Sequence, residues 1–464
     1  MYKIDRFFND IKGKKVAFCG IGRSNIPLIK MFYNKGIKKI IACDAKSKDD
    51  LVNELNDLEG FNIEFNLGKN YLELSDADII FRTPGLNFNN EYLKRYRSEG
   101  RIVTSEMELF FDLCPCRTIA ITGSDGKTTT TSIIYNMLKK QGENVFLGGN
   151  LGMPLLNRIE EIQENDFAVV ELSSFQLISM RKSPDISVIT NIAPNHLDVH
   201  KSMDEYISAK KNIFLHQGAF DKTVINIDNE IVKGFADETR ARVFSFSMDE
   251  REINNGAYLD KNNDIYLCTD GKPHFVMNAD EIKIIGRHNI ENYLSAICAV
   301  SDYVSIENMR EIAREFNGVE HRIEFVKEIE GVKYYNDAIA TSPTRAIKGT
   351  LSLYDRKIIM IAGGYDKQIP FEDLGPVICD KVKLLILMGD TAEKIENSVR
   401  NSKNYNKDDI NIIKVSNMKE AIDVSRKYSK PGDIVSLCPA CASFGLYKDF
   451  VEKGNDFKQI VNNL

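Results

Sequence analysis

Tryptophan is absent from this chain of 464 residues, and histidine occurs only six times. No apolar run approaches the roughly 18 residues that a membrane-spanning helix needs, so we expect no membrane span. The first residues, 1–8, are too polar for a secretion signal. These absences predict a cytoplasmic protein that does not bind a membrane.

An excess of positive charge is also lacking. The chain has 61 Lys and Arg against 67 Asp and Glu, a formal net charge of −6. A basic footprint for nucleic acid or an anionic membrane is therefore not expected. With 43% hydrophobic residues the chain can build ordinary cores, and its length predicts about three domains of roughly 150 residues each.

The nine cysteines do not form a recognisable disulfide or zinc framework. Most lie in apolar, strand-like runs, where cysteine behaves as a small buried hydrophobe. Two pairs are close in sequence, Cys114-Pro-Cys116 and Cys438-Pro-Ala-Cys441. A redox pair or half of a zinc site is the alternative, but neither pair has a second C-x-x-C or a nearby histidine. We therefore expect buried packing thiols.

A glycine-rich turn between a strand and a helix is the most informative local pattern. The apolar run Ile119–Ile121 leads into Gly123-Ser-Asp-Gly-Lys-Thr128, and a helix is predicted over 129–140. Glycines let backbone N–H groups approach phosphate oxygens, and the helix dipole favours negative charge. Lys127 would reach the β- and γ-phosphates and Thr128 would ligate Mg²⁺. The two glycines are three residues apart instead of five, so this is a shortened phosphate loop.

The first third begins with a second nucleotide-type unit. A strand over 14–19 leads into Gly20-Ile-Gly22, a helix over about 26–35, and a strand that ends at Asp44. Asn25 occupies the place of the third glycine of G-x-G-x-x-G, so the pattern favours a Rossmann-like βαβ unit without fixing its ligand. NAD or another nucleotide-bearing group remains open.

Further polar residues follow predicted strands, where ligands of parallel sheets bind. A strand over 77–81 precedes the turn Thr83-Pro84-Gly85, for which a plain Pro-Gly turn is the alternative. A buried strand over 166–170 precedes Glu171, which is well placed to bind Mg²⁺. Alternating strands and helices, including a strand over 186–190, predict an α/β fold with a parallel sheet.

Other segments have less specific patterns. Gly148-Gly-Asn150 is expected to form a flexible loop, and Lys210 and Lys211 are expected to be solvated charges on a helix over 206–214. Residues 222–280 are rich in strands, with hairpin signals at 254–256 and 261–264, and predict a small antiparallel addition. Asn289 and Asn292 share one face near the start of a helix, where capping is the alternative for Asn289.

These patterns predict an α/β protein of three domains. We expect a Rossmann-like N-terminal domain over 1–113 and a P-loop ATPase-like central domain over 114–318. That domain would have a parallel sheet and the small antiparallel addition. A Rossmann-like C-terminal domain would span 319–464, with strands over 357–361, 383–388 and 433–437.

The order of these segments resembles the Mur ligase family, ATP-dependent amino-acid ligases of peptidoglycan precursor synthesis. The resemblance covers nearly the whole chain. Its most specific parts are the short phosphate loop, Glu171-Leu-Ser-Ser-Phe-Gln176, Asn191…His196-Leu-Asp198, Tyr206…Ala209-Lys210, Gly286-Arg-His-Asn289, His321-Arg322 and Asn336-Asp337. The turn at Thr83 and the segment Ser436–Phe444 favour the D-glutamate-adding branch. We find no Asp-Asn-Pro-type motif of the diamino-acid adders in the last domain.

The resemblance implies a role for each matching residue. Catalysis would involve Lys127, Glu171, His196 and Lys210. ATP would be held by Gly123, Ser124, Asp125, Gly126, Lys127, Thr128, Thr129, Asn289, Asn292, Arg322 and Asp337. The UDP-linked acceptor, UDP-muramoyl-alanine, would be held by Gly22, Arg23, Ser24, Asn25, Asp44, Lys46, Thr83, Pro84, Gly85, Asn150, Ser173, Gln176 and His196. D-glutamate would be received by Lys367, Ser443, Phe444 and Phe450.

The resemblance also implies cofactors and an oligomeric state. Two Mg²⁺ ions would be ligated by Thr128, Glu171, His196 and Lys210, with Lys210 carbamylated by CO₂ so that it acts as a carboxylate. The protein would work as a monomer on small-molecule substrates. Three positions depart from the family pattern: Asp125 replaces a common Asn, Ile339 stands where some members have a lysine, and Tyr365-Asp-Lys367 differs from the usual Gly-Lys.

Three alternatives stay open at the level of the sequence. Another ligase of the family could add L-alanine or a diamino acid, or could be of the folylpolyglutamate type. An NAD-dependent oxidoreductase could be built on Gly20, Gly22 and Asp44. A P-loop ATPase or switch could hydrolyse ATP without any amino acid.

Overall fold

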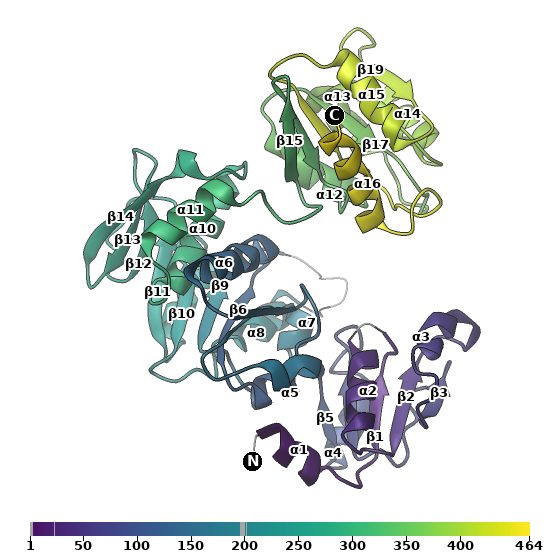
Figure 1. The fold of residues 1–464 in the computed structure, drawn as a ribbon, viewed down its shortest axis with the longest axis vertical. Helices are drawn as coiled ribbons and strands as arrows, with labels where there is room; N and C mark the ends of the chain where they lie inside the picture. Colours follow the sequence, from purple (N-terminus) through teal and green to yellow (C-terminus); the bar gives the residue numbers. More distant parts are fainter. Residues whose placement is uncertain (1–2, 23, 195–199, 201) are drawn as a thin grey trace. The chain divides into compact units, whose positions relative to one another are not determined.

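The computed structural model describes residues 3–22, 24–194, 200 and 202–464, and forms two compact units (Figure 1). Unit 1 comprises Met1–Ile282 and Arg287–Arg314, and unit 2 comprises Lys283–Gly286 and Glu315–Leu464. The predicted α/β class is confirmed, because the strands form three sheets in which parallel pairs predominate. The domain boundaries after residues 113 and 318 stay predictions.

The first sheet of unit 1 has five parallel strands in the order β3-β2-β1-β4-β5. The strands are β1 (Val16–Cys19), β2 (Ile40–Asp44), β3 (Glu64–Leu67), β4 (Ile79–Arg82) and β5 (Ile102–Thr104). The helices are α1 (Lys3–Asp10), α2 (Asn25–Asn34), α3 (Val52–Asn56), α4 (Glu91–Ser98) and α5 (Glu106–Leu113). This order places the carboxyl ends of β1 and β4 side by side, as the Rossmann-like prediction requires.

The second sheet has nine strands in the order β14-β13-β12-β11-β10-β9-β6-β8-β7. The strands are β6 (Arg117–Thr122), β7 (Val145–Gly149), β8 (Phe167–Glu171), β9 (Ile186–Ile189), β10 (Lys222–Asn226), β11 (Arg242–Ser247), β12 (Gly256–Leu259), β13 (Asp264–Thr269) and β14 (Lys272–Asn278). The helices are α6 (Lys127–Gln141), α7 (Ser174–Leu177), α8 (Met203–Lys211), α9 (Glu230–Lys233), α10 (Arg287–Val300) and α11 (Ile306–Glu315). The phosphate loop thus connects a central strand, β6, to α6.

Three predictions for this sheet were wrong. The antiparallel addition is smaller than expected, because β10 and β11 extend the parallel sheet and only the pairs β12–β13 and β13–β14 are antiparallel. The turn at 254–256 leads from β11 to the parallel strand β12, whereas the turn at 261–264 does join a hairpin. Gly148 and Gly149 belong to β7 and are not part of a loop.

Unit 2 contains a six-stranded sheet in the order β15-β16-β20-β17-β18-β19, parallel except for the edge strand β15. The strands are β15 (Glu324–Ile329), β16 (Val332–Asn336), β17 (Ile358–Ala362), β18 (Val382–Leu387), β19 (Asn411–Lys414) and β20 (Ile434–Leu437). The helices are α12 (Pro343–Ala346), α13 (Leu374–Lys381), α14 (Ala392–Arg400), α15 (Met418–Tyr428) and α16 (Phe450–Asn462). The three strands predicted from the sequence are β17, β18 and β20.

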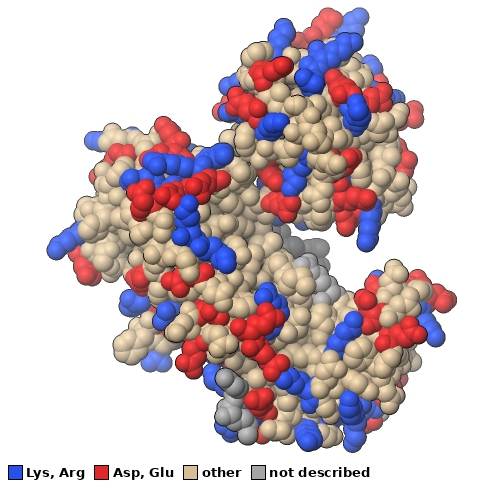
Figure 2. All heavy atoms as spheres, in the orientation of Figure 1, with Lys and Arg blue, Asp and Glu red and all other residues tan. Residues whose placement is uncertain are grey.

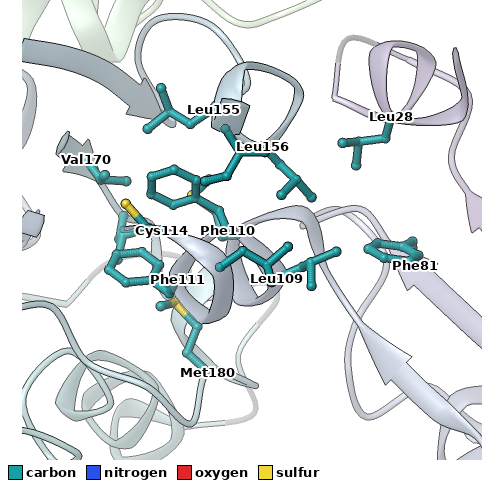
Figure 3. Close-up of a cluster of buried hydrophobic side chains, with 14 of the residues drawn as sticks. Leu28, Phe81, Leu109, Phe110, Phe111, Cys114, Leu155, Leu156, Val170 and Met180 are labelled. Carbon is teal, nitrogen blue, oxygen red and sulfur yellow. The ribbon is translucent and has the colours of Figure 1, made fainter. Parts of the chain in front are cut away.

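A single apolar cluster joins the two sheets of unit 1 (Figure 3). Helix α5 contributes Leu109, Phe110 and Phe111, which lie between Phe81 of the first sheet and Val170 of the second. All these side chains are at most 6% exposed. Burying an aromatic or leucine side chain contributes about 1.5–3 kcal/mol, so this cluster fixes the first sheet against the second.

The cysteines of the described residues are all free and buried, as expected for packing thiols. On the face shown in Figure 2, acidic and basic side chains are interspersed. None of the helices in the described ranges is long and apolar enough to span a bilayer.

Candidate active site

The phosphate loop is shaped by two glycines with positive φ. Gly126 (φ 77°) precedes α6, and a Cβ there would come within 2.4 Å of Oδ1 of Asn292. Gly123 is as tightly enclosed, because its Cβ would lie 1.9 Å from Oγ1 of Thr190. The Lys127 ammonium donates to the carbonyl oxygens of Gly123 and Ser124, each at 2.9 Å. The Lys127 side chain therefore lies over the phosphate loop, where it was predicted to contact the ATP phosphates.

The segment that follows β9 also forms hydrogen bonds to the phosphate loop. The Asp125 N–H donates to Oδ1 of Asn191 (2.9 Å), and Oγ1 of Thr190 donates to the Asp125 carbonyl (2.6 Å). Ser124 Oγ donates to the carbonyl of Ala193 and lies 3.0 Å from the Tyr206 hydroxyl. The Asp125 side chain is exposed, so its carboxylate is not buried in the loop. Position 125 supports the loop through its backbone.

Helices α6 and α10 meet beside the loop. Thr128 and Thr129 lie in the first turn of α6, and Thr130 Oγ1 donates to Oδ1 of Asn292 (3.2 Å). Asn292 Nδ2 donates in turn to Oδ1 of Asn289 (3.0 Å). Asn289 is the third residue of α10 and not its N-cap, so capping does not explain it. Both asparagines are buried against the phosphate loop.

Glu171 ends β8 next to the loop, because it pairs with Ile121 of β6. Its side chain is 2% exposed, and Oε1 accepts a hydrogen bond from Nδ2 of Asn150 (2.8 Å). Oε2 is buried and has no hydrogen-bond partner among the residues that the structure describes. A buried, unsatisfied carboxylate oxygen is costly unless a ligand completes it, so its chemistry fits a metal ion.

Lys210 contradicts the expectation of a solvated helix charge. Its side chain is 2% exposed, and Nζ donates to the Gly123 carbonyl (2.7 Å) and to Thr122 Oγ1 (3.1 Å). Burial, together with the Lys127 charge, holds the pKa of Lys210 well below its ordinary value. Lys211 pairs with Glu238 at the surface, as a solvated lysine would. The two neighbours therefore differ in environment.

Two predicted site residues, His196 and Arg23, lie outside the described residues. The nearby His200 is described and buried. Its Nε2 lies 2.9 Å from Oγ of Ser174, and its ring stacks on Phe175 at 5.1 Å. Among the described residues, no three His, Cys, Asp or Glu side chains form a metal-binding group.

A pocket of about 200 Å³ in unit 1 gathers six of the thirteen predicted acceptor residues. It is lined by Ser24 and Asn25 from the start of α2, by Thr83 and Pro84 after β4, by Asn150 after β7, and by Gln176 of α7. Ser173 and Gln176 also form a capping box at α7, so each has a structural role as well. Asn150 both lines the pocket and binds Glu171, which links the pocket to the phosphate loop.

The remaining acceptor residues lie around the turn after β1. The Asp44 carboxylate accepts from the backbone N–H of Ile21 (2.8 Å) and of Lys46 (3.0 Å). It therefore braces the turn that contains Gly22. Lys46 and Gly85 are both exposed. None of these residues lines the pocket itself.

In unit 2 the predicted residues follow the carboxyl ends of the strands. Asp337 follows β16, is 3% exposed, and accepts from Thr350 Oγ1 (2.6 Å). Burial raises the pKa of Asp337 to about 7, although Thr350 and Arg322 lower it. Arg322 Nε is buried and has no hydrogen-bond acceptor in the described part of the chain. Asp337 thus has a raised pKa, and Arg322 has a buried N–H group to which a ligand could offer an acceptor.

The proposed glutamate residues lie in the loops after β17 and β20. Lys367 is exposed, and Phe444 is 50% exposed with its ring 6.0 Å from that of Tyr365. Ser443 is buried with an unsatisfied Oγ. Phe450 begins α16 and contacts the His321 ring. Asp366, which belongs to the segment that differs from the family pattern, forms an ion pair with Lys394.

Several pocket residues were missed from the sequence: Arg82, Ser105, Glu106, Met107, Gly149, Gly152 and Pro154. Arg82 had a usable signal, since a charged residue ends an otherwise apolar strand directly before the Thr83 turn. Glu106 had none, because its neighbours predict only an ordinary helix start.

Comparison with known proteins identifies the class to which this fold and site belong. Residues 121–300 match the model of the Mur ligase middle domain, and residues 321–441 match that of the Mur ligase glutamate ligase domain. The chain belongs to the Mur ligase family.

Particular relatives match over their full length. A protein named UDP-N-acetylmuramoylalanine–D-glutamate ligase from Acetivibrio thermocellus is 50% identical, over 100% of this chain and 99% of that protein. One of the same name from Clostridium tetani is 46% identical, over 99% and 100%. The crystal structure of UDP-N-acetylmuramate-alanine ligase from Thermotoga maritima has a TM-score of 0.56 at 18% identity, covering 97% of this chain and 99% of that chain. The last likeness shows the fold alone.

Proposed function

We propose that this protein is an ATP-dependent ligase that joins D-glutamate to UDP-N-acetylmuramoyl-L-alanine in peptidoglycan precursor synthesis. The observation that carries the proposal is Asn150, which lines the acceptor pocket and binds Glu171 beside the phosphate loop. This contact supports one continuous site, in which the acceptor carboxyl group would lie next to the γ-phosphate of ATP. The names of the full-length relatives support the same substrates.

The chemistry requires activation of a carboxylate. The alanyl carboxylate attacks the γ-phosphorus of ATP, ADP leaves, and an acyl phosphate results. The neutral amine of D-glutamate then attacks the acyl carbon, a proton is lost, and phosphate leaves as the amide forms. Lys127 and the backbone N–H groups at the start of α6 would stabilise charge on the phosphate oxygens.

Magnesium fits the residues next to this loop. The unsatisfied Oε2 of Glu171 and the hydroxyl of Thr128 would hold the ion, together with His196 and a modified Lys210. When bound, Mg²⁺ supplies positive charge that shields the phosphate oxygens. The residues of the chain would position the ion beside the phosphate loop.

Lys210 suits this role only if its charge is reversed. Burial and the Lys127 charge hold the pKa of Lys210 well below its ordinary value, which favours the neutral amine relative to a solvated lysine. That amine can add to the carbon of CO₂ and release one proton, which leaves a carbamate of charge −1. A carbamate would remove the repulsion with Lys127 and provide an oxygen ligand.

Residues of unit 2 complete the proposal on the strength of the family resemblance. Arg322 and Asp337 would contact the nucleotide of ATP, and Lys367, Ser443, Phe444 and Phe450 would receive D-glutamate. We propose that the enzyme works as a monomer in the cytoplasm, where ATP and nucleotide-activated acceptors are available.

A coupled phosphate-release assay tests the function. Purified protein should release phosphate from ATP only when UDP-muramoyl-alanine and D-glutamate are both present. L-glutamate, L-alanine, meso-diaminopimelate and L-lysine should each give little release in place of D-glutamate. Release with a folate and L-glutamate would instead indicate a folylpolyglutamate-type ligase, and turnover without any amino acid would indicate an ATPase.

A further inference from the structure

Two thiols lie in contact where α5 is joined to β6. Cys114 is the C-cap residue of α5, Cys116 directly precedes β6, and their sulfur atoms are 3.5 Å apart. Both cysteines are free, and each is 7% exposed. Pro115 lies between them and restricts the backbone, so the chain has little freedom to separate the two sulfurs. The pair is therefore arranged in advance for a reaction between its own sulfurs.

The thiol pair lies between the apolar core and a second cavity. Both cysteines belong to the apolar cluster that joins the two sheets of unit 1, and Figure 3 shows Cys114 beside Phe110. Cys116 also lines a cavity of about 420 Å³. Because Arg117 and Phe167 begin β6 and β8, this cavity lies at the amino ends of these strands, opposite the phosphate loop. A small reagent can thus reach Cys116 without entering the candidate active site.

The charge around this second cavity favours a neutral reagent. Among the described residues, its lining includes one cationic and four acidic side chains: Arg117, Glu143, Glu164, Asp166 and Asp185. An anionic oxidant such as oxidised glutathione is repelled by the excess of negative charge, whereas hydrogen peroxide carries no charge. The size and charge of the cavity therefore favour a small peroxide as the oxidant.

The pair can supply the thiolate that such a reaction needs. Contact with the Cys116 thiol lowers the pKa of Cys114, and the same contact raises the pKa of Cys116. Either sulfur can donate the hydrogen bond between them, so transfer of the remaining proton to Cys114 places the thiolate on Cys116. The sulfur that lines the cavity can therefore act as the nucleophile.

A metal site is the other chemistry that two close thiols could serve. Structural zinc is held by four protein ligands. Over the described ranges, no three His, Cys, Asp or Glu side chains are grouped so that they could hold a metal ion. Two thiols without further ligands favour oxidation over metal binding.

We propose that Cys114 and Cys116 are a modification site, at which a peroxide forms a reversible disulfide. The Cys116 thiolate attacks one oxygen of hydrogen peroxide, the O–O bond breaks, and the departing hydroxide takes up a proton to become water, which leaves a sulfenic acid. The Cys114 thiol then attacks that sulfur, the S–O bond breaks, the S–S bond forms, and a second water carries away the thiol proton. Together the two sulfurs lose two electrons, and one peroxide becomes two waters.

Closure of the disulfide changes the connection between the two sheets of unit 1. The sulfurs must approach from 3.5 Å to about 2.05 Å, which moves Cys114 within the apolar cluster. The affected segment joins α5, which contributes to that cluster, to β6, which leads into the phosphate loop. The inference does not depend on the substrates proposed above, because it concerns residues at the opposite edge of the sheet.

Peptide mapping of the reduced full chain tests the proposal. The protein is exposed to hydrogen peroxide, and the remaining free thiols are then alkylated in denaturant with N-ethylmaleimide. Tryptic cleavage after Arg101 and Arg117 leaves both cysteines in one peptide, 102–117. This peptide should escape alkylation and become about 2 Da lighter than its dithiol form, at a rate proportional to peroxide concentration. Dithiothreitol should restore the dithiol.

A second thiol pair provides the matched control. Cys19 and Cys43 lie opposite each other in the β1–β2 ladder, contact with Cys19 raises the pKa of Cys43, and both are 0% exposed. They should oxidise at least about tenfold more slowly than Cys114 and Cys116, since thiol oxidation follows exposure. Equal rates for the two pairs would make the proposal wrong. A rate that does not rise with peroxide concentration would also overturn it, because unfolding would then control access.

Single variants separate the two sulfurs. In Cys114→Ser, Cys116 should still react and give a sulfenic acid that dimedone traps. In Cys116→Ser, Cys114 should react at least about tenfold more slowly, because Cys114 does not line the cavity. The reverse order would contradict entry of the oxidant through the cavity, and full alkylation of the wild-type peptide would remove the site. If a variant fails to fold, the wild-type comparison with Cys19 and Cys43 decides.

Discussion

Lys210 and Glu171 are each 2% exposed, yet they carry opposite formal charges beside the phosphate loop. Neither forms an ion pair with the other among the described contacts, and each has a feature that a ligand would relieve. For Glu171 it is an unsatisfied Oε2, and for Lys210 it is a strongly depressed pKa. Carbamylation of Lys210 would replace a buried amine next to Lys127 with a negatively charged carbamate that can bind a metal ion.

Replacement of Lys210 tests that explanation at the scale of one residue. Lys210→Ala should lower the rate of phosphate release by about 100-fold or more, since loss of a metal ligand or its support has effects of this size. Added formate or acetate should restore part of the activity by supplying the missing carboxylate. The measurement is the steady-state rate at saturating substrates, with ATP affinity as a check of folding.

The neighbouring lysine provides the control. Lys211→Ala removes a surface pair with Glu238, which is worth little, so its activity should stay within about twofold of wild type. Full activity of Lys210→Ala would exclude Lys210 from the metal site. Equal losses in both variants would point to damage to α8 instead.

Glu106 makes a prediction about stability and pH. Burial raises the pKa of Glu106 from its ordinary value of 4.5 to about 7, so the folded state holds the proton more tightly than the unfolded state. Its contribution to stability is therefore fully present below about pH 4.5 and is lost as pH rises through 7. Glu106→Gln should remove this loss, amounting to about 3 kcal/mol between pH 5 and 8.5.

Urea unfolding at a series of pH values measures this effect. The stability difference between Glu106→Gln and wild type should grow in favour of the variant from pH 5 to 8.5. Glu161→Gln serves as the control, because Glu161 is exposed beside Arg158 and the Arg158 hydrogen bond lowers its pKa. Its difference from wild type should be flat over this range. A flat difference for Glu106→Gln would mean that this carboxyl is ionised without cost.

At the scale of elements, α6 has a glycine with positive φ at each end. Gly126 (φ 77°) precedes it and Gly142 (φ 98°) follows it. A Cβ at Gly126 would lie 2.4 Å from Asn292 of α10, whereas nothing lies within 4 Å of one at Gly142. The two positions share backbone strain and differ in packing.

Alanine substitutions at the two ends should therefore behave differently. Each costs about 1–2 kcal/mol for the left-handed backbone, but only Gly126→Ala must also displace α10 from the phosphate loop. We expect Gly126→Ala to weaken ATP binding at least tenfold and Gly142→Ala to leave it within about threefold. Calorimetric titration of ATP decides, and equal affinities would show that contact between α6 and α10 does not shape the site.

The elements also show what the sequence could and could not predict. The β6-loop-α6 unit was predictable, because an apolar run, glycines and a helical pattern are all local. The parallel placement of β10 and β11 was not, since the same turn residues serve hairpins and crossovers. Lys210 and Lys211 are neighbouring lysines on one predicted helix, and their helical pattern does not show which is buried. Packing of α8 against the phosphate loop buries Lys210. The position of Arg82 at the end of an apolar strand was visible in the sequence, but its burial was not, because that burial depends on Phe175 and Ser179, 93 or more residues away.

At the scale of the whole molecule, the residues proposed for different ligands lie in different compact units. The phosphate loop and the pocket lie in unit 1, whereas the residues proposed for D-glutamate lie in unit 2. A ligand that binds only the native form of one unit protects that unit from opening, by an amount set by its concentration relative to Kd. Ligand effects on hydrogen exchange should therefore be separable along the chain.

UDP alone should slow exchange in segments around Ser24, Thr83 and Asn150 and leave residues 315–464 unchanged. D-glutamate alone should slow exchange around Lys367 and Ser443 and leave the pocket segments unchanged, because its two carboxylates match the lysine and the unsatisfied Ser443 hydroxyl. Hydrogen exchange with mass spectrometry on the full chain measures both, and L-glutamate provides the stereochemical control. Protection by D-glutamate confined to unit 1 would move the amino-acid site to the other unit. Equal protection by L-glutamate would remove the selectivity on which the ligase assignment depends.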